Sequence, residues 1–245
     1  MLTLTVHRAT DQIGGNCIEI EVDGRRLLLD AGSPLDAGDI PPEQQVPSTL
    51  DLGGAMEGVV VSHPHLDHYG LLRGLPSHWP VWTGSASAAL MRLTTRLAGA
   101  NLPQTIHTYA SFETFEVGPF TITPLLADHS AFDAHMLLIQ GGGRRVLYSG
   151  DFRRTGRKSS LVDRLLREPP ADVDVLLLEG TTLGRAGSFP TEQDLEEQFV
   201  ECFEDVRGRV FVSWSAQNVD RTVTILTLPP LDGPRGQAAA FDAAW

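Results

Sequence analysis

Short apolar runs, many of them alternating with polar residues, recur along most of this chain. Alternation with a period of two is typical of strands that bury one face. The pattern predicts strands over residues 2–7, 16–22, 25–30, 58–62, 114–117, 120–125, 135–140, 144–149 and 173–178. Between the third and fourth of these, residues 32–54 are rich in proline and glycine and predict a long loop.

Three segments have helical patterns instead. Residues 85–98 are rich in Ala, Leu, Met and Arg, and residues 160–168 stop at Pro169-Pro170. Residues 191–206 begin with Thr191-Glu192-Gln193-Asp194, a capping signal. With 245 residues, 42% of them hydrophobic, the chain can bury one good-sized core. The pattern alone therefore predicts a mixed α and β fold.

The run His63-Pro64-His65-Leu66-Asp67-His68 holds four metal-ligand side chains in six residues. It follows the apolar run of residues 58–62, which reads as a buried strand. Side chains two apart on an extended backbone point the same way, and Pro64 favours that geometry at His63. His63 and His65 are thus expected to converge on one ion, while Asp67 and His68 turn into a helix and face a second. Three imidazoles with a carboxylate suit zinc or a similar divalent metal.

Two further candidate ligands stand at the ends of other predicted strands. His129 follows the alternating segment that begins at Phe120, and Asp151 closes the run Val146-Leu147-Tyr148-Ser149-Gly150. Each candidate therefore lies at the carboxyl end of a strand, where sheets with parallel strands present their chemistry.

The order HxHxDH, then a later His, then Gly-Asp resembles the metallo-β-lactamase superfamily. That resemblance implies an α+β fold, an αββα sandwich, with two divalent metal ions, zinc first and manganese as the alternative. It assigns the first metal to His63, His65 and His129, the second to Asp67 and His68, and the bridging position to Asp151. Asp30, in the run Leu27-Leu28-Leu29-Asp30-Ala31-Gly32, matches the family's first motif. There it supports the loop of the histidine cluster without binding metal.

Further motifs resemble the β-CASP group of nucleases within that superfamily, which includes ribonuclease J. They are Gly150-Asp151-Phe152-Arg153, Glu179-Gly180-Thr181-Thr182 and Ser213 to Arg221. The resemblance makes Glu179 an acid/base residue near the leaving group and makes Asp67 the residue that orients the nucleophile and takes its proton. For Glu179, a carboxylate at a helix N-terminus is the alternative.

The same resemblance divides the chain into three parts. Residues 1–210 would form the metallo-β-lactamase-like domain, and residues 211–228 would open a β-CASP-like domain. Residues 229–245 form a Pro/Gly/Ala-rich tail that is expected to be disordered. The resemblance implies that the β-CASP-like domain is truncated, and hence a weakened second metal site and impaired catalysis.

Composition restricts the partners only in part. The net charge of −12 gives no general attraction to nucleic acid, although two bound ions would add about four positive charges locally. A basic cluster at Arg153, Arg154, Arg157 and Lys158 could contact phosphates, with a solvated loop as the alternative. No apolar stretch suits a signal peptide or a membrane span, so a cytoplasmic address and no membrane partner are expected. Cys17 and Cys202 are expected to be buried small side chains.

Three functions remain open from the sequence. The first is a metal-dependent phosphodiesterase that acts on RNA or single-stranded DNA. The second is a small-molecule metallo-hydrolase that cleaves thioesters, lactones or phosphodiesters. The third is a metal-binding remnant without turnover. The sequence does not define an oligomeric state.

Overall fold

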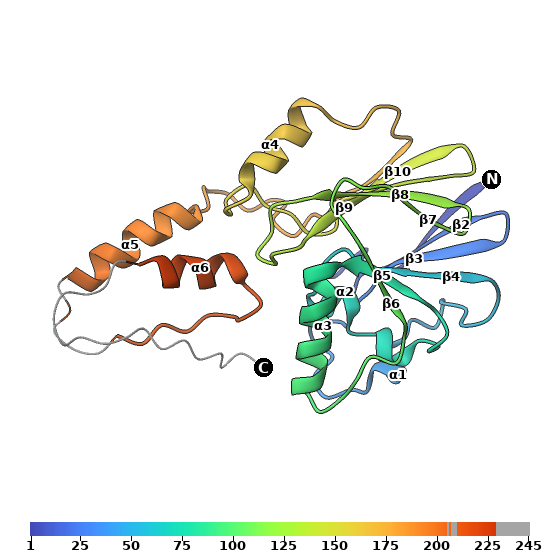
Figure 1. Cartoon of the computed structure of the whole chain (residues 1–245), viewed down its shortest axis with the longest axis horizontal. Coiled ribbons are helices and arrows are strands. Elements are labelled where there is room, and N and C mark those ends of the chain that lie inside the picture. The colour runs from blue at the N-terminus through green and yellow to red at the C-terminus, as the bar shows by residue number, and fades with distance from the viewer. Residues whose placement is uncertain (205, 207–209, 229–245) are drawn as a thin grey trace.

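Two β-sheets lie face to face in the computed structural model, which describes residues 1–204, 206 and 210–228 (Figure 1). The strands of the first sheet are β1 (Leu2–Arg8), β2 (Cys17–Val22), β3 (Arg25–Ala31), β4 (Met56–Val60), β5 (Val81–Gly84) and β6 (Ile106–Tyr109). They lie in sequence order; β1 to β3 are antiparallel, and β3 to β6 are parallel. The carboxyl ends of the four parallel strands therefore share one edge.

The second sheet has the order β11-β10-β9-β8-β7. Its strands are β7 (Phe115–Val117), β8 (Phe120–Leu126), β9 (His135–Gly141), β10 (Arg144–Tyr148) and β11 (Val175–Leu177). All neighbours are antiparallel except β10 and β11, which are parallel. Because of that parallel pair, the segments that follow β10 and β11 leave the sheet at the same end.

Helices cover the outer faces of both sheets. They are α1 (Pro42–Gln45), α2 (Leu66–Tyr69), the 3-10 turn η1 (Leu72–Gly74), α3 (Ser85–Leu97), α4 (Ser159–Arg167), α5 (Glu192–Glu204) and α6 (Val219–Thr227). In Figure 1, α2 and α3 lie beside the first sheet, α4 lies beyond the second, and α5 and α6 extend to the left. Within the described residues, no helix combines the length and the apolar character that crossing a bilayer requires.

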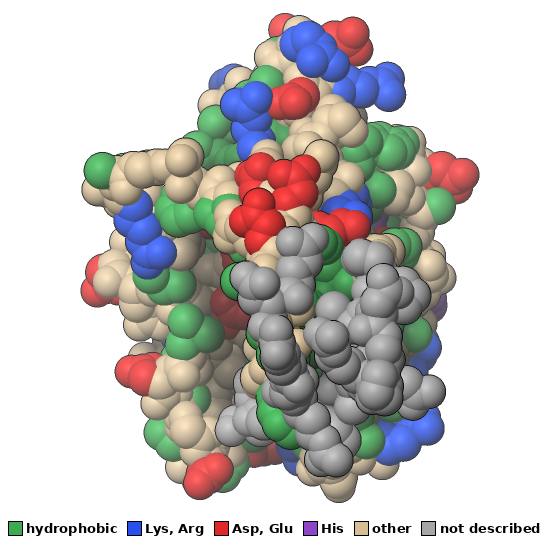
Figure 2. Space-filling model, turned by 90° about the vertical axis from the view of Figure 1, so that its left-hand side faces the viewer, with side chains coloured by type: hydrophobic (Ala, Val, Ile, Leu, Met, Phe, Trp, Pro, Cys, Tyr) green, Lys and Arg blue, Asp and Glu red, His purple; other side chains and the backbone are tan. Residues whose placement is uncertain are grey.

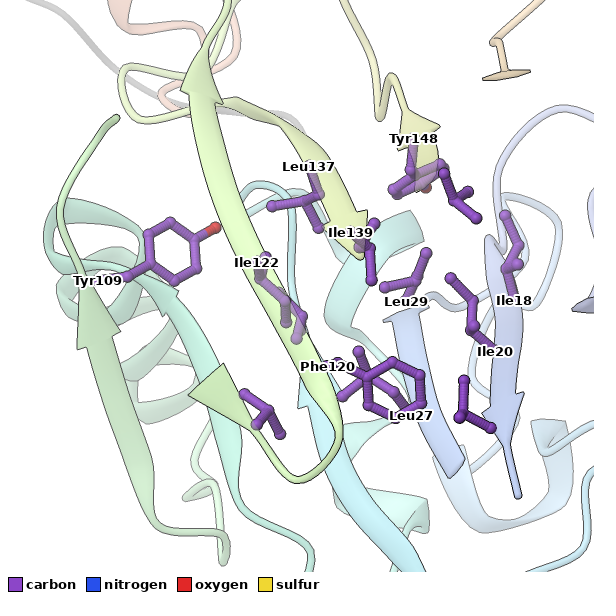
Figure 3. Packing of buried hydrophobic residues seen from close by; sticks show 14 residues of the cluster. Ile18, Ile20, Leu27, Leu29, Tyr109, Phe120, Ile122, Leu137, Ile139 and Tyr148 are labelled. Carbon is purple, nitrogen blue, oxygen red and sulfur yellow. The ribbon is translucent and has the colours of Figure 1, made fainter. Parts of the chain in front are cut away.

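The main core fills the space between the sheets. Ile18 and Ile20 of β2, Leu27 and Leu29 of β3, and Phe120 of β8 meet there (Figure 3). Alternate residues of β3 point the other way, so Leu28 joins a second core under the helices. Burying each such side chain stabilises the fold by about 1.5–3 kcal/mol. The alternation read from the sequence thus divides the first sheet between two cores.

The α+β sandwich predicted from the sequence is confirmed, with local corrections. Strands β5 and β6, of four residues each, were not predicted. β11 is shorter than predicted, and it is an edge strand with Leu176 and the following Leu178 exposed. Cys17 is buried as predicted, but Cys202 is exposed on α5, so that prediction was wrong. The predicted disordered tail, residues 229–245, lies outside the described residues.

Candidate metal centre

Two of the predicted ligands come from the connection between β4 and α2. His63 is fully buried, and His65 precedes α2 with an extended backbone (φ −90°, ψ 145°). His63 Nε2 lies 3.1 Å from His65 Nδ1. The two imidazoles therefore converge, as their spacing and the intervening proline predict.

The third imidazole arrives from the second sheet. His129 lies in the connection between β8 and β9, and its Nε2 is 3.2 Å from His65 Nδ1. The ring centroids of His63 and His129 are 4.7 Å apart. One nitrogen from each of His63, His65 and His129 lies within 4.8 Å of the others, so this group could hold an ion. The structure thus brings the predicted first ligand set together from two sheets.

A second group of donors shares His63 with the first. It consists of His63, His68 and Asp151, with donor atoms again within 4.8 Å of one another. His68 Nε2 is 3.3 Å from Asp151 Oδ1, and His129 Nε2 is 3.9 Å from Asp151 Oδ2. The Asp151 carboxylate therefore belongs to the second group and also lies close to His129 of the first. Its bridging role stays a prediction that this position supports.

Asp67 and Glu179, the two predicted catalytic residues, flank the donors. Asp67 Oδ2 lies 3.7 Å from His68 Nε2, and Asp67 belongs to neither of the three-residue groups described above. Glu179 follows β11 and accepts a hydrogen bond from the backbone N–H of Phe152, at 2.8 Å. No helix begins at Glu179 in the described chain, so the alternative of a helix N-terminal carboxylate is wrong.

A buried carboxylate, Asp30, supports the histidine cluster from behind. Its oxygens accept hydrogen bonds from Ser62 N (2.7 Å), Ser62 Oγ (2.8 Å) and the Tyr148 hydroxyl (2.6 Å). Its Oδ2 also lies 2.7 Å from His68 Nδ1. A carboxylate at Nδ1 leaves Nε2 of His68 directed at the centre, which is a common way to orient a metal-binding imidazole. Sequence reasoning found Asp30 but missed Tyr148, whose place in an apolar strand gave no sign of this contact.

The electrostatics of the imidazoles fit metal binding. Burial lowers the pKa of His63 well below its ordinary value, and the neighbouring imidazoles lower it further. Burial and His65 bring the pKa of His129 to about 3. Burial alone would lower the pKa of His68, but Asp30 and Asp151 outweigh it and raise that pKa well above normal. Neutral imidazoles with free lone pairs are the form that binds a divalent ion. The lowered pKa values favour that form in His63 and His129, which fits zinc or a similar metal, whereas His68 must lose a proton when an ion binds.

The carboxylates respond to the same surroundings in opposite ways. Burial would raise the pKa of Asp151, but His68 and His129 outweigh it and lower that pKa. Burial raises the pKa of Glu179, and the Asp151 carboxylate raises it further. Asp151 therefore stays ionised to a lower pH than an ordinary aspartate, and Glu179 takes up a proton at a higher pH than an ordinary glutamate.

The basic side chains after Asp151 are paired with carboxylates, so this segment is not a free solvated loop, and its contact with phosphates stays a prediction. Arg153 Nη2 lies 2.5 Å from Asp220 Oδ2 on α6, and Lys158 Nζ lies 3.7 Å from Asp220 Oδ1. Arg157 pairs with Glu196 of α5 at 2.9 Å. These contacts tie residues 153–158 to α5 and α6. They involve residues far apart in the sequence, so the pattern did not reveal them.

Two buried carboxylates complete this arrangement, which we call the anchor network. Asp128 accepts hydrogen bonds from the backbone N–H groups of Gly156 (2.8 Å) and Lys158 (3.2 Å). Glu192 accepts two hydrogen bonds from Arg221, at 3.1 and 3.3 Å. The anchor network comprises Asp128, Arg153, Arg157, Lys158, Glu192, Glu196, Asp220 and Arg221. It holds the segment after Asp151 in place.

Close backbone packing fixes the start of α2. A Cβ atom added to Gly32 would lie 1.6 Å from the carbonyl oxygen of Asp67. Gly32 N–H also donates to Asn16 O at 2.8 Å. The atoms that a Cβ would meet belong to the backbone and cannot move aside as a flexible side chain could, so only glycine fits at this position.

The family of the chain follows from a match to a model described as "Beta-lactamase superfamily domain" over residues 25–214. The chain belongs to this superfamily. Its α+β sandwich, with donors gathered at one edge, is the metallo-β-lactamase arrangement that the motifs predicted. A solved structure of a protein of unknown function from Enterococcus faecalis has the same fold. It matches with a TM-score of 0.79 and 21% identity, over 94% of this chain and 64% of that one.

Curated relatives of this superfamily member bear the name ribonuclease J. An RNase J-like protein of Methanocaldococcus jannaschii is 28% identical over 217 residues, which is 82% of this chain and 48% of the relative. Ribonuclease J of Mycolicibacterium smegmatis is 27% identical over 240 residues, 92% of this chain and 42% of the relative. The chain thus spans less than half the length of these two relatives.

Proposed function

We propose that the protein is a metal-dependent phosphodiesterase that cleaves single-stranded RNA, with single-stranded DNA as a further substrate to be tested. One observation carries the proposal: two groups of donors share His63, and Asp151 of the second group also lies close to His129 of the first. Such paired sites suit the displacement of an oxygen at phosphorus. The names of the ribonuclease J relatives support RNA as the substrate.

The two ions, zinc or manganese, would lower the pKa of a bound water and neutralise charge on the phosphate oxygens. The first would be held by His63, His65 and His129, and the second by Asp67 and His68, with Asp151 shared. Asp67 would orient the attacking water and accept its proton. Its carboxylate is well placed, since Oδ2 lies 3.7 Å from His68 Nε2.

Glu179 would act at the other end of the scissile bond. Its raised pKa lets the carboxyl keep a proton, which it can give to the departing oxygen. Phe152, the residue that follows Asp151, donates its backbone N–H to the Glu179 carboxyl and fixes the position of that carboxyl. The anchor network holds residues 153–158, so Glu179 and Asp151 keep their positions relative to each other.

The domain division and the cytoplasmic address remain part of the proposal. Residues 1–210 would form the metallo-β-lactamase-like unit and residues 211–228 the start of a β-CASP-like unit. Within the described chain, the second part contributes α6, which carries Asp220 and Arg221 of the anchor network.

A substrate panel tests the function. The 245-residue chain, loaded with zinc or manganese, is incubated with end-labelled single-stranded RNA, the equivalent DNA, an acyl thioester and a lactone. Cleavage of RNA that EDTA abolishes and Asp151→Asn strongly reduces is the expected result. Turnover of only the thioester or the lactone would assign a small-molecule hydrolase instead. Stoichiometric metal without turnover of any substrate would identify a metal-binding remnant.

A further inference from the structure

Two exposed phenylalanines lie at the edge of the sandwich that carries the metal centre. Phe132 is 58% exposed and follows His129 by three residues. Phe112 is 55% exposed and lies just beyond the carboxyl end of β6, which shares its edge of the sheet with the carboxyl end of β4, the strand before the histidine cluster. Neither ring takes part in the proposed chemistry, and both are large apolar groups left in water.

Hydrogen bonds hold the segment that carries Phe132 on both sides, so the fold keeps this side chain exposed. Ala127 N–H donates to Ala134 O at 2.9 Å and closes the segment at its base. The Lys158 ammonium donates to the carbonyl oxygens of His129 and Ala131, each at 3.3 Å. Asp133, the next residue, accepts a hydrogen bond from Ser87 N at the start of α3. The loop therefore presents Phe132 on a rigid support.

Phe112 is held in a conformation that disfavours its own side chain. Its φ is +67°, in the left-handed region, where a bulky residue is strained. A hydrogen bond of 2.7 Å from Phe112 N to Pro124 O fixes it there. Glycine or asparagine would fit this backbone better. A strained position that also exposes a phenyl ring indicates that the ring is used for binding.

The residues next to the two phenylalanines in the chain lie close to the same histidine. Ser111, which precedes Phe112, has its Oγ 2.9 Å from His135 Nε2. Asp133, which follows Phe132, has Oδ1 3.7 Å from the same nitrogen. One buried imidazole thus connects the two segments, so Phe112 and Phe132 belong to adjoining segments of the same rim.

The rim carries charges of both signs, whereas the face formed by α5 is acidic. The Lys158 ammonium lies 6.0 Å from the centroid of the Phe132 ring, but its charge is shared with Asp220 of the anchor network, and Asp133 follows Phe132 in the chain. On the face formed by α5, acidic side chains gather, as Figure 2 shows. Among them are Asp194, Glu197 and Glu201, which line a shallow hollow with Phe189. Phosphates would be repelled from that face.

We propose that Phe112 and Phe132 form a stacking surface for the bases of single-stranded RNA whose backbone enters the metal centre; this rests on the proposed function. Aromatic side chains stack on bases without regard to sequence, and each stacked base stabilises binding markedly. The rings would hold bases while the centre engages a phosphate. Such a surface would favour single strands, because the bases within a duplex are already stacked on one another and have no free face to offer.

The test measures binding of two nuclease-resistant phosphorothioate strands of equal length by fluorescence anisotropy at low salt. One is RNA, and the other lacks its bases. Phe132→Leu keeps an apolar side chain without a ring, and Phe112→Asn removes the ring while relieving the left-handed strain. Each is expected to raise the Kd for RNA about tenfold and to change the Kd for the abasic strand by less than about twofold. Phe189→Leu, at an equally exposed phenylalanine on the acidic face, should change neither.

The outcomes separate this inference from the function on which it rests. If the wild type binds and cleaves RNA but the variants bind it equally well, stacking is refuted and the nuclease stands. If the wild type neither binds nor cleaves RNA, both proposals fail. Equal loss of the two strands would show that the rings shape the phosphate path, which also overturns stacking. A melting temperature that is unchanged or higher in Phe112→Asn excludes unfolding as the cause of weaker binding.

Discussion

The histidine side and the carboxylate side of the metal centre are built by different means. The histidine side, His63 to His68, lies against the core, where buried Asp30 bonds Ser62, His68 and Tyr148. On the carboxylate side, the side chain of Asp151 is 24% exposed, and the following segment is held by ion pairs to α5 and α6. The first side is therefore fixed by the sandwich itself. The second depends on a segment that docks from later in the chain.

This difference shows how one centre can combine stable metal binding with adjustable chemistry. Ion pairs that reach the surface contribute less than buried bonds and weaken with salt. Losses on the histidine side should therefore reduce metal content and stability. Losses on the carboxylate side should reduce turnover first.

The largest expected effect is the loss of metal from the double variant His63→Ala, His65→Ala. Removing two of three imidazoles leaves a site too poor to compete with water, so bound metal should fall to background. Elemental analysis of purified protein measures it, with exposed His78→Ala as the matched control. Chelation of the wild type should also lower its melting temperature. Equal metal in the double variant and the wild type would refute this ligand assignment.

Asp151→Asn is expected to lower the rate of hydrolysis by about a hundredfold or more, and by more than His129→Ala does. A carboxylate shared by two ions fixes their separation, so neutralising it loosens both. His129 contributes to the first group only. Comparison of kcat for the two variants at saturating metal measures the effect. Near-normal turnover by Asp151→Asn would favour a centre with a single ion.

Asp30→Asn, on the histidine side, should lower the free energy of unfolding more than Asp220→Asn, on the carboxylate side. Asp30→Asn should lower the free energy of unfolding by about 3–5 kcal/mol, because it breaks a buried network. Asp220→Asn should cost about 1–3 kcal/mol, since its partner Arg153 keeps some contact with water and two other carboxylates. Urea unfolding in the presence of EDTA compares them. Equal losses would mean that the anchor network is as much part of the core as Asp30.

The smallest expected effect is an acid sensitivity of the metal-free protein that involves His129. Its pKa is about 3 in the folded state and about 6.5 when unfolded, so the unfolded chain binds more protons between these values. The stability that neutral His129 confers is full above about pH 6.5 and declines as the pH falls toward about 3. The loss should reach about 2 kcal/mol by about pH 5. Unfolding at several pH values in EDTA should show a weaker dependence for His129→Gln, and an unchanged dependence would contradict the shift.

Much of this centre could be predicted because its signals are local. His63, His65 and His68 stand within six residues, and His129 and Asp151 each end a strand. The anchor network could not be predicted, since Arg153 and Asp220 are 67 residues apart and each resembles an ordinary surface charge. Helix α6 was missed as well, although Asn218 caps it by accepting a hydrogen bond from Arg221 N. Phe112 and Phe132 escaped notice because exposed rings on loops follow no pattern.

One close contact, at Gly32, has a consequence for inheritance. A single methyl group there would meet the backbone of Asp67 and displace the start of α2. Every metal ligand and every hydrogen-bonding residue of the centre would still be present in the sequence. A one-base change in codon 32 that replaces this glycine could therefore inactivate the protein, although every metal-binding and catalytic residue is unchanged. Descendants that drift freely elsewhere in this loop should keep glycine at that codon for as long as the centre is under selection.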